Sequence, residues 1–251
     1  MGEALLGGLV AGGFAPANEL AVVEPVEARR KELAERFAGV TVLERPVAAD
    51  ASVIAVKPGL VGEVCEQLGG VDATGRVLSI AAGVTIASLE AALPAGTPVV
   101  RAMPNTPALV GAGASAIAGG TSAGDDDLAW ASEILGAVGI VVTVPEPALD
   151  AVTGLSGSGP AYVFLVAESL IEGGVLAGLP RDTATLLAVQ TLLGSARLLA
   201  ETGQSPAEAR AAVTSPAGTT AAGLRALEDG GVRAAFLDAV DAATRRSREL
   251  G

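Results

Sequence analysis

The chain has 251 residues, 50% of them hydrophobic, which is enough for one large or two ordinary domains with a buried core. Its formal net charge of −12 and its lack of basic clusters argue against nucleic acid and anionic membrane surfaces as partners. With no histidine and a single cysteine, Cys65, the sequence excludes His-based acid–base catalysis, an internal disulfide and the usual zinc sites, so we expect no metal centre. Because no uninterrupted apolar run approaches about 20 residues and no secretory signal is evident, we expect a cytoplasmic protein without membrane spans.

Up to residue 146, apolar runs alternate with amphipathic segments. The first ten residues indicate a helix with small residues on one face. The runs expected to form strands buried on both faces are Leu20–Glu24, Ser52–Lys57, Arg76–Ile80, Pro98–Arg101 and Ile140–Val144. The helices expected between them are Val26–Phe37, Leu60–Leu68, Ile86–Leu93 and Asp127–Ala137. Because this alternation is typical of βαβ units, we predict an α/β domain with a doubly wound parallel sheet over residues 1–146.

Residues 147–251 contain no strand pattern and indicate an all-α second domain. Glycine and proline residues separate the expected helices, which are Ala161–Ala177, Pro180–Thr202, Pro206–Val213, Thr220–Glu228 and Val232–Leu250. The first two are apolar around much of their circumference. We therefore expect a partner chain to cover them, with packing against the first domain as the alternative.

The loop Val213–Thr220 brings several hydroxyl groups to the start of one of these helices. Ser215 or Thr219 is expected to cap the helix, and Pro216 and Gly218 shape its approach. Unpaired N–H groups and the macrodipole make a helix N-terminus a site for small anions such as carboxylates. The loop thus predicts either an anion site or an ordinary capped helix start.

The beginning of the sequence bears on the kind of ligand. A dinucleotide-binding βαβ unit has a strand and a Gly-x-Gly loop directly before a helix such as the first one here, and only Gly2 of that pattern is present. We expect the natural product to begin about 15 to 25 residues upstream, the length of one strand and a tight loop. Glu24 ends the next strand, where these folds place an acid for the adenosine ribose, although a surface glutamate there is also common.

Seven motifs together resemble those of the pyrroline-5-carboxylate reductases, the enzymes of the last step of proline biosynthesis. They are Met1–Leu5, Ala55–Pro58, Ala81–Thr85, Arg101–Pro107, Thr153–Tyr162, Val213–Thr220 and Arg245–Leu250. The resemblance covers the whole chain. It implies a Rossmann-type domain followed by a helical dimerisation domain, and homodimers that often assemble into larger rings. The implied reaction transfers a hydride from NADPH or NADH to the C=N carbon of a cyclic imino acid, giving L-proline.

The resemblance also implies roles for individual residues. Ser215, Gly218, Thr219 and Thr220 hold the substrate carboxylate, and the Thr220 hydroxyl lies near the ring nitrogen as the catalytic hydrogen-bond partner. Glu146 lies near the same site, with a plain interdomain hinge as the alternative. The expected cofactor-binding residues are Gly2, Glu24, Ala55, Val56, Lys57, Pro58, Ala81, Ala82, Gly83 and Asn105. Of these, Lys57 can also be a solvent-facing strand end and Asn105 a simple turn residue.

The sequence departs from the family pattern at two further positions, and two rival functions are compatible with parts of it. Ala217 stands where the family usually has glycine. Glu24 lacks an adjacent arginine for a 2′-phosphate, which favours NADH, although Arg29 and Arg30 can compensate, so the preference stays open. A β-hydroxyacid dehydrogenase also has a Rossmann domain followed by helices, but such enzymes rely on a lysine of the helical part as general acid and base. This rival is disfavoured because the helical half here has no lysine. The remaining alternative is a non-catalytic helical assembly module.

Overall fold

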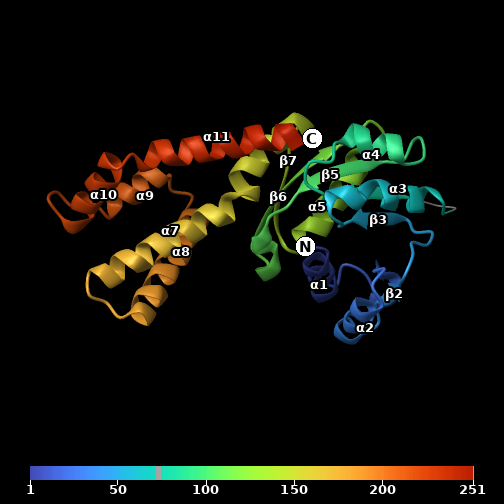
Figure 1. Cartoon of the computed structure of the whole chain (residues 1–251), viewed down its shortest axis with the longest axis horizontal. Coiled ribbons are helices and arrows are strands. Elements are labelled where there is room, and N and C mark those ends of the chain that lie inside the picture. Colours follow the sequence, from blue (N-terminus) through green and yellow to red (C-terminus); the bar gives the residue numbers. More distant parts are fainter. Residues whose placement is uncertain (72–74, 251) are drawn as a thin grey trace. The chain divides into compact units, whose positions relative to one another are not determined.

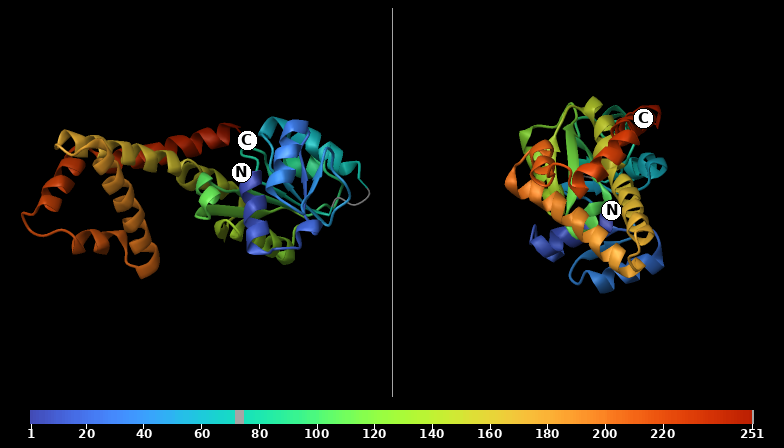
Figure 2. Two further views of the ribbon diagram at one scale, coloured as in Figure 1. Left: turned by 90° about the horizontal axis from the view of Figure 1, so that it is seen from below. Right: turned by 90° about the vertical axis from the view of Figure 1, so that its left-hand side faces the viewer.

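The computed structural model describes residues 1–71 and 75–250, which form two compact units (Figure 1, Figure 2). One unit contains Met1–Ser158 and the end of the chain from Ala242 onward, and the other contains Gly159–Asp241. These units divide later than the expected boundary after residue 146. The reason is Leu149, which is buried against the first unit together with Ile86, Ala116 and Ala118.

The first unit is built on a five-stranded sheet. Its strands, in spatial order, are β3 (Ala51–Ile54), β4 (Arg76–Ser79), β5 (Val99–Met103), β6 (Gly113–Gly119) and β7 (Gly139–Thr143). Strands β3, β4 and β5 are parallel, as predicted, but β6 pairs antiparallel with β5 and parallel with β7. The prediction missed β6 because its glycine- and alanine-rich sequence contains only one of the β-branched residues that indicate a strand, Ile117.

A separate two-stranded sheet pairs β1 (Ala21–Val23) in parallel with β2 (Thr41–Leu43), a strand that the sequence analysis missed. Helix α1 (Gly2–Gly12) packs against both sheets, with Leu6 in the cluster of the smaller sheet and Leu5 and Leu9 in that of the larger. In the doubly wound order the first strand lies between the strands that correspond to β1 and β3. Here these two strands are not paired with each other. The fold is therefore Rossmann-like, with its sheet in two parts.

Helices cover both faces of the larger sheet. On one face, α1 and α5 (Asp125–Gly136) bury apolar side chains against Leu78 and Val100. On the other, α3 (Val61–Gly69) and α4 (Ile86–Ala92) pack against Val77 and Val99. Cys65 lies in this second cluster at 0% exposure, which confirms it as a core residue. Helix α2 (Glu27–Arg36) packs on the small sheet through Leu33.

The chain continues from the sheet into helices, and residues 147–250 contain no strand, as predicted. The helices are α6 (Leu149–Val152), a π-helical turn at Thr153–Gly157, α7 (Gly159–Leu176), α8 (Arg181–Thr202), α9 (Pro206–Ala212), α10 (Thr219–Asp229) and α11 (Val232–Leu250). The helices α7 and α8 lie side by side (Figure 1). A Cβ on Gly174 would come within 3.1 Å of Ala184 Cβ, so glycine permits this close packing.

Many apolar side chains of α7 and α8 are exposed in the single chain, including Val163, Phe164, Leu165, Leu186, Leu187 and Leu193. By length and composition alone, two helical segments, Glu146–Leu176 and Arg181–Thr202, are suited to crossing a membrane. Neither segment is an uninterrupted apolar run, because the first contains Glu168 and the second Arg197. An exposed apolar surface of this kind is typical of an interaction site.

Candidate active site

The predicted cofactor residues of the larger sheet lie along one of its edges. Ala55–Pro58 follows β3, Ala81–Gly83 follows β4 and Asn105 follows β5. Because β3, β4 and β5 are adjacent and parallel, these segments meet at the carboxyl edge of the sheet, where doubly wound folds bind ligands. Lys57 is exposed at this edge, and its carbonyl oxygen accepts a hydrogen bond from the Leu60 N–H at 2.9 Å.

Two glycines allow the backbone to come close at this edge. A Cβ on Gly2, the first residue of α1, would lie 3.0 Å from Ala55 Cβ, so the start of the helix touches the end of β3. Gly83 has a φ of +76°, a left-handed conformation that glycine adopts without strain. The N-terminus of α1 has no side-chain cap. An uncapped helix N-terminus beside glycines, where a side chain would otherwise occupy the space, suits the phosphates of a dinucleotide.

Glu24 lies at the end of β1, as predicted, and its Oε1 accepts a hydrogen bond from the Val26 N–H at 2.9 Å. Arg29 and Arg30, the two arginines that could compensate near Glu24, have different partners. Arg29 is bound by Glu32 and Glu3, whose hydrogen bonds raise the pKa of its guanidinium. Arg30 instead donates from Nη1 to the carbonyl oxygen of Glu24 at 2.9 Å. Arg30 is therefore the cation next to Glu24.

Asn105 is buried, and both ends of its side-chain amide have protein partners. Oδ1 accepts from the Ala114 N–H at 2.8 Å, and Nδ2 donates to the Ser156 carbonyl oxygen at 3.0 Å. These bonds join the end of β5 to the start of β6 and to the π-helical turn. The Asn105 side chain thus links three segments of the backbone, which its turn-like sequence did not indicate. Its contact with a cofactor stays a prediction.

Glu146 is also held by protein groups. Its Oε1 accepts from the Ile86 N–H at 2.7 Å, in the first turn of α4, and from Arg101 Nη1 at 2.9 Å. The Arg101 side chain is 10% exposed and that of Glu146 is 30% exposed. This pair fastens the turn before α6 to strand β5 within the first unit. Contact of Glu146 with an imino acid stays a prediction.

The predicted substrate loop lies in the helical unit and leads directly into α10. Neither Ser215 nor Thr219 caps this helix, contrary to expectation: Gly218 is the N-cap, and there is no side-chain cap. A turn closed by the Gly218 N–H and the Ser215 carbonyl oxygen, 3.1 Å apart, brings the chain into the helix one residue before Thr219. A Cβ on Gly218 would lie 2.3 Å from Ser215 Oγ, so a side chain at this position would push the Ser215 hydroxyl aside. The first turn of α10 therefore presents amides without a capping hydroxyl, beside the half-buried Thr220.

Ala217 has a φ of +55°, and among the described residues it is the one non-glycine residue with positive φ. The left-handed conformation costs an alanine about 1–2 kcal/mol. From the sequence, this position differed only in having alanine where the family usually has glycine. Strain of this kind commonly marks functional loops.

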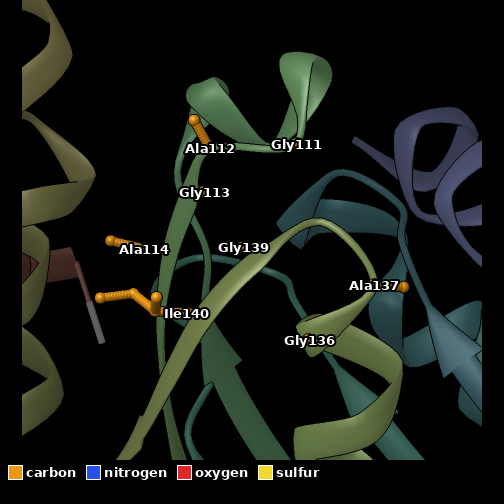
Figure 3. Close-up of a pocket in the computed structure, with 8 residues that line it drawn as sticks. All are labelled: Gly111, Ala112, Gly113, Ala114, Gly136, Ala137, Gly139 and Ile140. Atoms are coloured by element: carbon orange, nitrogen blue, oxygen red, sulfur yellow. The ribbon is translucent and has the colours of Figure 1, made fainter. Parts of the chain in front are cut away.

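Two hollows lie elsewhere on the first unit. Figure 3 shows one of about 420 Å³ between the starts of β6 and β7, lined mainly by glycine and alanine. The other, of about 840 Å³, lies beside Arg76 and Pro98, at the starts of β4 and β5. Neither is lined by a predicted site residue. The candidate cofactor residues therefore lie along the carboxyl edge of the sheet in the first unit, and the candidate substrate residues lie in the loop before α10 in the second.

Comparison with known families assigns both parts of the chain. Residues 146–250 match the family model described as pyrroline-5-carboxylate reductase dimerisation. Residues 1–83 match the model described as NADP oxidoreductase, coenzyme F420-dependent.

Full-length relatives decide the family. The pyrroline-5-carboxylate reductase of Corynebacterium melassecola is 45% identical over 100% of this chain and 95% of its own length. The chain belongs to the pyrroline-5-carboxylate reductase family. The reductase of Synechocystis is 48% identical with the same coverage. These matches favour the reductase over the assembly-module alternative.

Solved structures of pyrroline-5-carboxylate reductases agree with this assignment. That of the Coxiella burnetii enzyme has a TM-score of 0.93 and 38% identity, and the alignment covers 100% of this chain and 94% of the other. That of the Plasmodium falciparum enzyme, with NADP bound, has a TM-score of 0.83 and 29% identity, again over 100% and 94% of the two chains. The similarity in fold therefore extends over the whole chain.

Proposed function

We propose that this chain reduces the C=N bond of 1-pyrroline-5-carboxylate to give L-proline, with NADPH or NADH as the hydride donor. The observation that carries the proposal is the identity of 45–48% to pyrroline-5-carboxylate reductases over the entire chain. These alignments span both the carboxyl edge of the sheet and the loop before α10.

The substrate carboxylate binds at the N-terminus of α10. Gly218 leaves the first-turn amides without a side-chain cap, and the helix macrodipole favours a negative charge there. Ser215 and Thr219 add hydroxyl groups around the same turn. Because Ser215 Oγ lies against the Gly218 backbone, a side chain at residue 218 would displace it.

The Thr220 hydroxyl is the catalytic hydrogen-bond partner of the ring nitrogen. A hydroxyl both donates and accepts, so it can stay bonded as the nitrogen changes from iminium to amine. A protonated imine is already activated toward hydride and needs no strong acid from the protein. This chemistry is compatible with a chain that has no histidine.

The carboxyl edge of the sheet holds the dinucleotide. Gly2 and the amides of the first turn of α1 face its phosphates, Gly83 and Ala55–Pro58 shape the cradle, and Glu24 binds the adenosine ribose. When bound, the reduced nicotinamide supplies the hydride. The residues of this edge bind and orient it.

The assembly we propose is a homodimer through the helical unit. A second copy buries the exposed apolar side chains of α7 and α8, and the match of residues 146–250 to a dimerisation family supports this. Rings of dimers and a cytoplasmic location are further parts of the proposal.

Turnover of 1-pyrroline-5-carboxylate by Thr220 variants tests the catalytic assignment. A hydrogen bond to a charged group contributes about 1.5–3 kcal/mol, so Thr220→Val lowers kcat/KM by about 10- to 100-fold and Thr220→Ser restores most of it. Thr202→Val is the control, because that exposed hydroxyl bonds only to backbone groups of its own segment, donating to the Leu198 carbonyl oxygen and accepting from the Gln204 N–H. Equal activity of Thr220→Val and the parent protein refutes the role of Thr220. If the parent protein is inactive with both cofactors, the assembly module becomes the better account.

A further inference from the structure

The end of α11 packs on the first unit through polar residues. The helix runs from Val232 to Leu250, and its two buried residues, Thr244 and Ser247, are both polar. From Ala242 onward the helix belongs to the same compact unit as the nucleotide-binding sheet. A polar buried face on a helix calls for specific partners.

Asp150 is the partner of this helix end. Ser247 Oγ donates a hydrogen bond to Asp150 Oδ1 at 2.7 Å, and Arg248 Nε lies 4.0 Å from Asp150 Oδ2. Asp150 follows Leu149, which is 1% exposed and fixes α6 to the sheet. The Asp150 carboxylate is therefore held in place on the first unit, and it contacts two consecutive residues of α11, Ser247 and Arg248.

The last turn of α11 reaches the loop after β4. A Cβ on Gly83 would lie 3.4 Å from the Leu250 carbonyl oxygen and 3.7 Å from Leu250 Cβ. The backbone of Gly83 thus passes close to Leu250, in the left-handed conformation noted above. Residues 80–85 are the loop at the carboxyl end of β4, which the proposed function assigns to the dinucleotide.

We propose that the contact of Ser247 with Asp150 positions the last turn of α11 against the Gly83 loop, and that this backing preorganises the loop for the dinucleotide. Ser247 and Asp150 are positioning residues and touch neither substrate nor cofactor in this account. The inference rests on the proposed function for the identity of the ligand, but the contact itself concerns only this chain. Preorganising a loop raises affinity by reducing the ordering required when the ligand binds.

The test compares four forms of the full chain: the parent protein, Ser247→Ala, Ser247→Thr and Arg246→Gln. Arg246 lies on the same turn, is largely exposed and pairs with Glu249, so its substitution is the matched control. Two quantities are measured. One is hydrogen–deuterium exchange of residues 80–85 without cofactor, and the other is the Kd for NADPH and for NADH.

In Ser247→Ala we expect faster exchange of the 80–85 amides and a Kd for the dinucleotide raised about two- to tenfold, the equivalent of one hydrogen bond. The KM for 1-pyrroline-5-carboxylate stays within twofold of the parent value, as roughly expected when substrate contacts are unchanged. Ser247→Thr keeps the hydroxyl and restores both quantities, and Arg246→Gln matches the parent protein.

Unchanged exchange and unchanged Kd in Ser247→Ala overturn this inference while the reductase assignment stands. If the parent protein binds neither dinucleotide, the proposed function fails. The exchange measurement, which needs no cofactor, still reports whether the end of α11 restrains the loop. A general loss of protection throughout the first unit of Ser247→Ala, without restoration by Ser247→Thr, also contradicts the inference.

Discussion

The ion pair of Arg101 and Glu146 joins strand β5 to the turn before α6, and its contribution to the stability of the first unit can be measured. Glu146 Oε1 is shared between the Arg101 guanidinium and the Ile86 N–H. Substituting Glu146→Ala removes both bonds and leaves a buried cation without this partner. An uncompensated buried charge destabilises a protein far more than a lost exposed contact does.

The size of the effect follows from burial. Breaking a buried pair costs about 3–5 kcal/mol, and the partial exposure of Glu146 lowers our expectation for Glu146→Ala to about 2–4 kcal/mol of unfolding free energy. Glu146→Gln keeps an oxygen acceptor for the Ile86 N–H and is expected to lose about half as much. In a double-mutant cycle with Arg101→Met, the coupling energy is expected to be about 2 kcal/mol.

The chain offers a matched control pair for this cycle. Arg181 Nη1 and Glu172 Oε1 also lie 2.9 Å apart, but the two side chains are 58% and 64% exposed. The cycle Arg181→Met with Glu172→Ala is expected to show coupling close to zero, because solvent screens the pair. Both cycles are measured by urea denaturation at a fixed protein concentration, since a dimer's stability depends on concentration. Equal coupling in the two pairs refutes the argument from burial.

Three further predictions concern single positions. Ala217→Gly is expected to leave the free energy of unfolding unchanged or to raise it by about 1 kcal/mol, because relief of left-handed strain offsets the flexibility of glycine. The control Ala226→Gly, within α10, is expected to lower it by about 1 kcal/mol in the same assay. Equal losses at both positions contradict the strain at Ala217. Burial raises the pKa of the Cys65 thiol and shields it, so a disulfide reagent is expected to label it only on unfolding; rapid labelling of the native protein at neutral pH contradicts its place in the core. Arg30→Gln is expected to raise the KM for NADPH more than that for NADH, because its guanidinium lies against Glu24, and an unchanged ratio of the two excludes a role in binding a 2′-phosphate.

The sequence predicted those elements whose signal is local. The parallel strands β3, β4 and β5 appeared as continuous apolar runs, and helices such as α8 appeared between proline and glycine signals. Strand β6 was missed because Gly113–Gly119 stands in a strand through pairing with its neighbours and not through its own propensity. In such strands tertiary pairing outweighs local preference.

The site was predictable in part for the same reason. Parallel strands bring their carboxyl ends to one edge, so Ala55–Pro58 and Ala81–Gly83 could be placed from strand order alone. The amide contacts of Asn105 and the helix N-cap at Gly218 depend on the folded backbone. The bond of Ser247 to Asp150 joins residues far apart in the sequence, which no local pattern indicates.

The most direct test of the central claim is to incubate the parent protein with 1-pyrroline-5-carboxylate and NADPH or NADH, and to measure L-proline formed and cofactor oxidised in the same sample. Transfer of one hydride to one C=N bond predicts equal amounts of the two, with no proline when either reactant is omitted. Oxidation of neither cofactor, or oxidation without proline, contradicts the assignment of this chain as a pyrroline-5-carboxylate reductase.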